Sequence, residues 1–331
     1  MAGHHPRVAV VWGGNTGEYE ISRRSALRVM EALKGFPLEP WLVEIRGSHW
    51  QVLGEGLQCA LNKDDFSFLH PAEGRKLSFD VVYNIIHGSP GEDGRLQGYL
   101  DMIGMPYTGC GFRTSLITMN KYLCKQMLRE VPVGLAASVL VRRGFPIDFS
   151  KIVDALGLPL FVKPANGGSS LGTHKVKSAE DLEPALEDAF LHDAEVMCET
   201  FIPGRELTCG VVGLRDEIHA LPVTEIIPHR EFFDYAAKYE GASSEVTPAA
   251  IAPELTALLQ EKARLVYKAL HCRGIVRVDF ILTKEGIPYF LEVNTVPGFS
   301  AQSIVPQQLI AAGLNPGQVI FELISEALQS R

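Results

Sequence analysis

Short apolar runs alternate with segments of helical spacing over the first third of the chain. Residues 8–12 form a continuous apolar run, which predicts a buried parallel strand, and residues 21–34 carry apolar side chains at the spacing of an amphipathic helix. Further strands are predicted at about residues 38–45 and 81–86. This alternation predicts a doubly wound α/β domain, in which ligands bind beyond the carboxyl ends of the strands.

Glycine-bearing loops follow two of these predicted strand ends, at residues 13–20 and 87–94. A nicotinamide-binding dehydrogenase domain would also have a glycine-rich loop after its first strand. Residues 13–17 lack the GxGxxG spacing, however, and no acidic partner for a ribose is evident. The two loops therefore predict a ligand site that is not a dinucleotide site.

The pattern changes near residues 108 and 203, which predicts three parts. Residues 1–108 form an N-terminal α/β domain, residues 109–202 a central part with a helix around residues 118–129, and residues 203–331 a C-terminal part. The C-terminal part has a strongly amphipathic helix at about residues 254–270. No internal repeat or low-complexity tract interrupts the chain.

Composition and charge indicate which classes of binding partner the protein can have. The net charge is −8, from 31 Lys and Arg against 39 Asp and Glu, which disfavours nucleic acid and favours a small molecule. The six cysteines are scattered without CxxC spacing, so zinc sites and disulfides are not expected. The short apolar run near the N-terminus is neither a membrane span nor a good signal peptide. A cytoplasmic protein without membrane or nucleic-acid partners is therefore expected.

An acidic hairpin is the most informative local feature. Residues 284–286 form a turn signal between two strands, and a turn centred between Glu285 and Gly286 places Asp279 opposite Glu292. Arg277 then lies opposite Asn294. Residues that face each other share one side of the sheet, as do residues two apart along a strand. The other, apolar face is predicted to carry Val278, Phe280, Leu291 and Val293.

Two carboxylates and an amide on one face suit a hard cation such as Mg²⁺, which binds one or two carboxylates together with substrate phosphates. The neighbouring Arg277 is placed to stabilise charge that develops beside the metal. A solvated sheet face with a simple Arg277–Asp279 ion pair is the alternative. The sequence Thr-Val-Pro-Gly that follows Asn294 favours the metal site.

A glycine- and serine-rich loop, residues 165–172, follows a short strand that ends with Lys163 and a proline. Adjacent glycines allow backbone N–H groups to close around an anion, and Lys163 adds a positive charge. The loop is neither a Walker A motif nor GxGxxG, and a flexible hairpin tip is the alternative. Residues 195–203 alternate polar and apolar side chains before a proline, as an adenine shelf or an interdomain linker would.

Taken together, these motifs resemble the D-alanine–D-alanine ligases of the ATP-grasp superfamily over nearly the whole chain. The shared segments are residues 13–18, 87–94, 106–109, 163–172, 233–239, 277–279 and 291–295. The resemblance implies an N-terminal pre-ATP-grasp domain that binds substrate, followed by an ATP-grasp fold of two subdomains, the second with the metal site. Asn120 and Thr200 stand where relatives frequently have aspartate and lysine.

The resemblance also implies roles for individual residues. Asp279, Glu292 and Asn294 would hold two Mg²⁺ ions, which Mn²⁺ can replace. Glu18, helped by His87, would bind the ammonium of the first D-alanine. Residues implied in nucleotide binding are Lys121, Lys163, Ser169, Glu199, Phe201, Ile202, Glu206, Phe232, Lys238 and Leu291. Residues implied in catalysis or in binding the second D-alanine are Ser169, Tyr239, Arg277, Gly298, Ser303 and Ile304.

The implied reaction joins two D-alanines for peptidoglycan precursor synthesis. ATP would convert the carboxylate of the first D-alanine to an acyl phosphate, and the amine of the second would attack it. Residues 230–247, with Lys238 and Tyr239, are the candidate closing loop, and Ser169 and Tyr239 would form a hydrogen-bonded group with Glu18. The alternative products are a D-alanine–D-lactate ester and D-alanine–D-serine. A homodimer is the assembly that the resemblance suggests.

Overall fold

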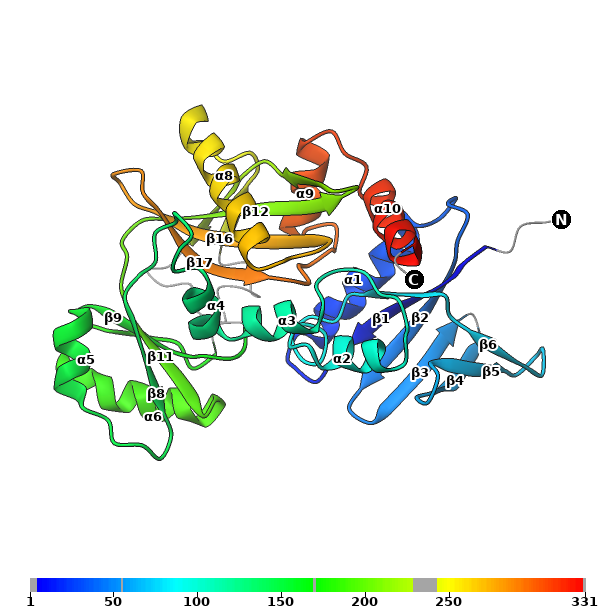
Figure 1. The fold of residues 1–331 in the computed structure, drawn as a ribbon, viewed down its shortest axis with the longest axis horizontal. Helices are drawn as coiled ribbons and strands as arrows, with labels where there is room; N and C mark the ends of the chain where they lie inside the picture. Colours follow the sequence, from blue (N-terminus) through cyan, green and yellow to red (C-terminus); the bar gives the residue numbers. More distant parts are fainter. Residues whose placement is uncertain (1–4, 55, 169–170, 229–242, 330–331) are drawn as a thin grey trace.

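The structure is a computed structural model, and it describes residues 5–54, 56–168, 171–228 and 243–329. Three sheets make up the fold (Figure 1). The N-terminal sheet has seven strands in the order β6-β5-β4-β3-β2-β1-β7. Its parallel centre consists of β1 (Arg7–Gly13), β2 (Glu39–Arg46) and β7 (Val81–Asn84). These three strands confirm the parallel strands predicted from the apolar runs.

The antiparallel extension of this sheet lies outside the predicted pattern. It consists of β3 (His49–Gly54), β4 (Leu57–Asn62), β5 (Ser67–His70) and β6 (Arg75–Ser78). Many of the side chains of these strands are exposed or half-buried, so no continuous apolar run marks them. Helices α1 (Tyr19–Ala32) and α2 (Arg95–Met102) follow β1 and β7 as expected for strand–loop–helix units.

The central part has a four-stranded sheet in the order β10-β9-β11-β8. The strands are β8 (Ser138–Arg142), β9 (Leu160–Pro164), β10 (His174–Val176) and β11 (Glu195–Thr200). Helices α5 (Phe149–Leu156) and α6 (Leu182–His192), the latter preceded by the 3-10 turn Ala179–Asp181, bury their apolar faces together with these strands.

The helix expected around residues 118–129 is confirmed by α4 (Lys121–Met127), although a separate helix, α3 (Phe112–Met119), precedes it. Asn120 between them has extended backbone angles. The side chain of Asn120 accepts a hydrogen bond from the backbone N–H of Leu123 at 3.0 Å, so it caps α4. This polar capping residue therefore separates α4 from the helix before it.

The C-terminal part has a six-stranded antiparallel sheet in the order β15-β14-β12-β16-β17, with β13 paired to β12. Its strands are β12 (Arg205–Leu214), β13 (Glu217–Ala220), β14 (Thr224–Pro228), β15 (Ser243–Val246), β16 (Ile275–Leu282) and β17 (Pro288–Asn294). Helix α8 (Pro253–Ala269) covers one face through Leu259, Ala263 and Val266, which confirms the predicted amphipathic helix.

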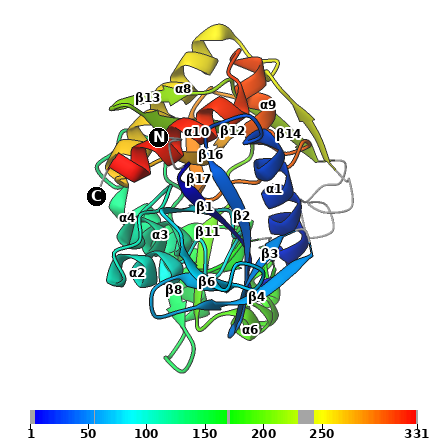
Figure 2. The same ribbon diagram turned by 90° about the vertical axis from the view of Figure 1, so that its right-hand side faces the viewer.

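The C-terminal helices close the molecule back onto its beginning. Helix α9 (Ile304–Ala311) precedes α10 (Pro316–Gln329), and α10 packs beside α1 and β7 (Figures 1 and 2). One apolar core contains Val8 and Val81 from the N-terminal sheet together with Phe299 and Ile320. The N-terminal loops are thereby held against the segment that follows β17.

Candidate active site

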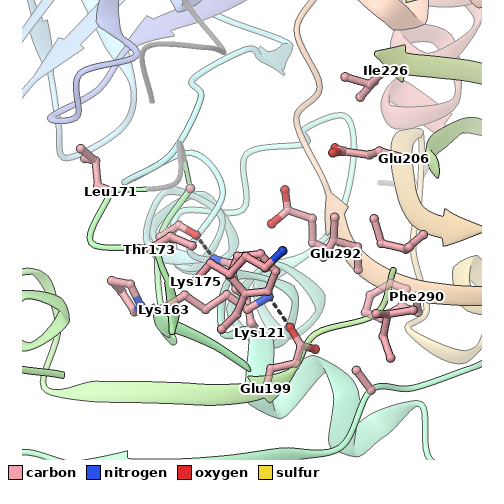
Figure 3. Close-up of a pocket in the computed structure, with 18 of the residues that line it drawn as sticks. Lys121, Lys163, Leu171, Thr173, Lys175, Glu199, Glu206, Ile226, Phe290 and Glu292 are labelled. Atoms are coloured by element: carbon pink, nitrogen blue, oxygen red, sulfur yellow. Dashed lines mark hydrogen bonds and ion pairs between the residues drawn. The ribbon is translucent and has the colours of Figure 1, made fainter. Parts of the chain in front are cut away.

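A cavity of about 640 Å³ is lined by all three parts of the chain. The N-terminal loops contribute Glu18 and Gly88, and the C-terminal sheet contributes Glu206 and Glu292. The central part contributes Lys121, Lys163, Thr173, Lys175 and Glu199 (Figure 3). The cavity has the size of a small-molecule or cofactor site, and its walls come from segments distant in sequence.

The predicted register of the acidic hairpin is confirmed. Asp279 pairs with Glu292, and Arg277 pairs with Asn294. The predicted position of the turn is wrong, because Leu282 pairs with Pro288, one residue out of step with the Asp279 pair. A register shift between Asp279 and Phe280 accounts for the difference, so the pairs from Asp279 away from the turn follow the predicted register.

This irregularity corrects the prediction for Leu291. Phe280 pairs with Phe290 and Asp279 with Glu292, so Leu291 is the extra residue on β17. It lines the cavity instead of joining the apolar face, and Phe290 takes its expected place in the core. A bulge of this kind redirects one side chain and shifts the pairing beyond it by one residue.

Four donors surround the buried carboxylate of Asp279, which is 2% exposed. Arg277 donates from Nε at 2.9 Å and from Nη2 at 2.8 Å, and Asn294 donates from Nδ2 at 3.0 Å. The hydroxyl of Thr208 on β12 also donates to it. Burial disfavours the charged guanidinium, but Asp279 outweighs this effect and raises the pKa of Arg277.

The oxygen atoms of these side chains are suitable ligands for a hard cation. Asp279 and Glu292 supply carboxylate oxygens. The amide nitrogen of Asn294 donates to Asp279, so Asn294 would bind a metal through its amide oxygen. Within the ranges that the structure describes, no group of three or more His, Cys, Asp or Glu side chains is placed to hold a metal ion without other ligands. Two carboxylates completed by the oxygens of bound phosphates are a typical arrangement for Mg²⁺.

Lysines and glycines form the opposite wall. Nζ of Lys163 lies 2.6 Å from Oε2 of Glu199, and Lys121 donates to the carbonyl oxygen of Gly167 (Figure 3). Gly167 has a φ of +113°, a conformation that favours glycine, and Gly167 and Gly168 both line the cavity. The loop residue Ser169 lies outside the described residues, as do Phe232, Lys238 and Tyr239 and most of the candidate closing loop.

Three neighbouring residues that the resemblance implies in nucleotide binding line the cavity. They are Glu199, Phe201 and Ile202, at and just beyond the end of β11. Nζ of Lys175 on β10 lies 3.6 Å from the centre of the Phe201 ring, a cation–π contact that sequence reasoning missed. Lys175 is part of a three-residue strand with no motif of its own, so only pairing with β9 brings it here.

The N-terminal loops meet the segment after β17 through His87 and Glu92. Nδ1 of His87 lies 2.7 Å from the carbonyl oxygen of Val296, so this nitrogen carries the proton, and Nε2 contacts Oγ of Ser25 at 3.1 Å. Glu92, to which sequence reasoning assigns no role, accepts a hydrogen bond from the N–H of Gly88 at 2.7 Å and one from the N–H of Val296 at 3.0 Å. His87 and Glu92 thus hold both sides of the Val296 residue.

Burial acts on both of these groups. It lowers the pKa of His87, and it raises the pKa of Glu92 to about 7, with help from the nearby charge of Glu18. Glu18 lies against Gly88, where an added Cβ would come within 3.1 Å of Oε2 of Glu18. The structure therefore brings the predicted pair Glu18 and His87 together.

The turn that leads into α9 carries the last predicted residues. Ser303 precedes α9, and its Oγ accepts from the N–H of Ser300 at 3.0 Å. A Cβ on Gly298 would lie 2.9 Å from Oγ of Ser303, so these two residues are in close contact. Ile304, which follows Ser303, is buried.

Known proteins match both the N-terminal and the C-terminal part of the chain. The family model described as D-ala D-ala ligase N-terminus matches residues 7–110, and the one described as D-ala D-ala ligase C-terminus matches residues 141–325. A D-alanine–D-alanine ligase of Bacteroides fragilis is 44% identical over 96% of this chain and 98% of its own length. One of Porphyromonas gingivalis is 45% identical over 98% of both chains.

Solved structures of similar fold include three ligases. The D-alanyl-alanine synthetase A of Vibrio cholerae has a TM-score of 0.88 and 28% identity, and covers 99% of this chain and 100% of its own. The VanG D-Ala:D-Ser ligase of Enterococcus faecalis has a TM-score of 0.86 and 34% identity, and the match covers 98% of this chain and 99% of the ligase. The D-alanine–D-alanine ligase of Bacillus anthracis, complexed with ATP, has a TM-score of 0.78 and 28% identity, and the match covers 98% of each chain. In the described part of this chain, no helix is long and apolar enough to cross a membrane.

Proposed function

The chain belongs to the D-alanine–D-alanine ligase family, and we propose that its cavity and the neighbouring Asp279–Glu292 wall form the active site. The enzyme joins two D-alanines at the expense of ATP, and its dipeptide product serves peptidoglycan synthesis. The relatives that carry this name are 44% and 45% identical over nearly the full length. Residues 1–108 are assigned to substrate binding, and residues 109–202 and 203–331 to the two halves of the nucleotide site.

The observation that carries the proposal is the distribution of charge across the cavity. Lys121 and Lys163 approach from the central part, and Glu292 and Glu206 from the C-terminal sheet (Figure 3). A triphosphate placed between them would meet lysines on one side and the candidate metal ligands on the other. Glu206 would bind the ribose, and Ile202, Phe201 and Leu291 would surround the adenine.

Asp279, Glu292 and Asn294 would hold two Mg²⁺ ions, which would neutralise phosphate charge when bound. The remaining groups of this wall act on the substrates directly. The guanidinium of Arg277, held by Asp279, would stabilise the oxyanion that forms at the substrate carbonyl, together with the N–H of Gly298.

The substrates would enter from the N-terminal loops and from α9. Glu18 would bind the ammonium of the first D-alanine, and Ser303 the carboxylate of the second. The carboxylate of the first D-alanine attacks the γ-phosphorus of ATP, giving an acyl phosphate and ADP. The amine of the second D-alanine then attacks the acyl carbon, and phosphate leaves, so that one amide bond forms for each ATP consumed.

The contacts of His87 support a second role beside the expected help to Glu18. Its two ring nitrogens contact Val296 and Ser25, and Phe299 donates to Ser25 Oγ at 3.1 Å. We therefore propose that His87 acts mainly by holding the segment around Gly298, with direct help to the ammonium as a secondary contribution.

Release of phosphate on mixing ATP, Mg²⁺ and D-alanine, with the product identified by mass, tests the activity. Adding D-lactate or D-serine in competition at near-neutral pH tests the second substrate. We expect D-alanyl-D-alanine to dominate. Dominant ester or mixed dipeptide would instead support the alternative that the VanG D-Ala:D-Ser ligase illustrates.

We further propose a homodimer in the cytoplasm, where ATP is available. Helices α2, α3 and α4 lie in a row (Figure 1), and their outer side chains include Met102, Phe112, Leu116, Leu123 and Met127, which are 45–82% exposed. An exposed apolar surface of this kind is typical of a protein contact. Sedimentation equilibrium tests the assembly, and Leu116→Glu is expected to weaken it.

A further inference from the structure

Lys125 is a buried lysine to which the proposed reaction assigns no role. It lies on α4, one helical turn after Lys121, and only 3% of it is exposed. Its ammonium contacts Oε1 of Glu199 and donates to the carbonyl oxygen of Ala136 at 3.2 Å. Unlike Lys121, Ala136 and Glu199, it is not among the residues that line the cavity. It therefore lies behind the wall that a ligand would touch.

Glu199 connects Lys125 to the cavity. One of its carboxylate oxygens contacts Lys125 and the other lies 2.6 Å from Nζ of Lys163, so one carboxylate bridges two ammonium groups. All three side chains are at least nine-tenths buried. With one negative and two positive charges, the cluster has a net charge of +1, and Lys163 is the lysine of the cluster that lines the cavity.

We propose that Lys125 is a positioning residue for ATP, which keeps Glu199 ionised and fixed so that Glu199 in turn holds Lys163 toward the nucleotide. The proposal rests on the proposed nucleotide roles of Lys163 and Glu199. It adds to them a residue that acts only through a second residue and never touches the ligand.

The charges depend on each other for a physical reason. Burial lowers the pKa of Lys125, and a carboxylate in contact opposes this effect by favouring the charged ammonium. Conversely, loss of Lys125 would leave one buried carboxylate oxygen of Glu199 without a cation beside it. This loss would favour protonation of Glu199. A protonated Glu199 would no longer form an ion pair with Lys163, and the hydrogen bond that remains between the ammonium and a neutral acid is weaker than one to a carboxylate.

A purely structural role predicts a different pattern of effects. Buried ion pairs can often be replaced by apolar groups at little cost to stability, whereas breaking a pair is destabilising. If Lys125 served only to fill the core, Lys125→Met would change the denaturation midpoint and leave ATP affinity unchanged. If it acts through Glu199, ATP affinity falls, and the loss disappears once Glu199 has lost its charge.

A double-mutant cycle in the full-length enzyme tests this. The dissociation constant of ATP with Mg²⁺ is measured by calorimetry without D-alanine for wild type, Lys125→Met, Glu199→Gln and the double variant. We expect Lys125→Met to weaken ATP binding about tenfold, equivalent to about 1.4 kcal/mol, and to leave the KM for D-alanine within about twofold. In the Glu199→Gln background, Lys125→Met should add less than about twofold.

Lys177→Met is the matched control, because Lys177 is an exposed lysine of the same part of the chain and its loss removes the same charge. Additive losses in the cycle, or unchanged ATP affinity in Lys125→Met, overturn the role of Lys125. If Lys163→Met and Glu199→Gln also bind ATP like wild type, the nucleotide site itself is wrong. If Lys125→Met does not fold, Lys125→Gln, which can still donate to Ala136, takes its place with the same expected results.

Discussion

Arg277 holds the carboxylate of Asp279 through two parallel hydrogen bonds, from Nε at 2.9 Å and from Nη2 at 2.8 Å. The two residues are two apart on β16, so the strand itself places both side chains on one face. The pair fixes the plane of the guanidinium and gives it a defined direction in the proposed active site. A planar, two-point contact of this kind is specific to arginine.

Replacing Arg277 is therefore expected to affect catalysis more than binding. In Arg277→Ala, kcat should fall by about 10²–10³, as for the loss of one oxyanion donor, while ATP affinity changes little. Asp279 also loses two donors while buried, so the free energy of unfolding should fall by about 3 kcal/mol. Steady-state kinetics, ATP titration and urea denaturation measure the three effects. Arg277→Lys should recover little activity, and a selective loss of ATP binding would contradict the assignment.

Glu292→Gln tests the metal wall. The amide keeps the size of the side chain but loses the negative charge that a divalent cation requires, so turnover should be abolished with little change in stability. Mg²⁺ dependence of phosphate release and thermal denaturation provide the two measurements. Glu285→Gln is a control from the same hairpin, in the turn. Activity of the Glu292 variant within about tenfold of wild type, or 1.4 kcal/mol, would refute the metal role.

Glu92 predicts a pH dependence of stability. Its pKa is about 7 in the folded protein against 4.5 as its ordinary value, so the folded state binds more protons than the unfolded state between these values. The contribution is fully present below about pH 4.5 and is lost as pH rises through 7, with a total of at most about 3 kcal/mol. Urea denaturation from pH 5 to 8 measures it.

Glu92→Gln should flatten this dependence, because the amide does not titrate. It should also lower kcat, since one amide cannot accept from both Gly88 and Val296 as the carboxylate does. Glu180→Gln, at an exposed position, is the control and should keep the wild-type slope. An unchanged pH dependence in the Glu92 variant would show that another group is responsible.

Asn120→Asp tests why an amide stands before Lys121. Nδ2 of Asn120 lies 3.1 Å from Oε2 of Glu195 and 3.1 Å from Oδ1 of Asn166. Aspartate would still cap α4 but would bring a second carboxylate to Glu195, so stability should fall by about 1–2 kcal/mol. Denaturation of the double variant Asn120→Asp/Glu195→Gln should show most of this recovered. A single variant as stable as wild type would rule out the repulsion.

Much of the fold and of the proposed metal site follows from local patterns. Apolar runs predict the parallel centre of the N-terminal sheet, and alternation along two strands joined by a turn predicts that Asp279 faces Glu292. Both rest on the period of a strand and on pairing across one hairpin, which involve residues close in sequence. Resemblance then extends these patterns to an activity and to several of the residues that line the cavity.

Tertiary structure decides the contacts between parts. Leu291 turns into the cavity because of a bulge that the hairpin sequence does not reveal. Glu92 reaches Val296 across 204 residues, and Lys125 reaches Glu199 between a helix and a separate strand. Such contacts depend on how three sheets pack, and no local spacing encodes them. The sequence by itself thus determines which residues share a strand face, while packing determines which buried charges meet.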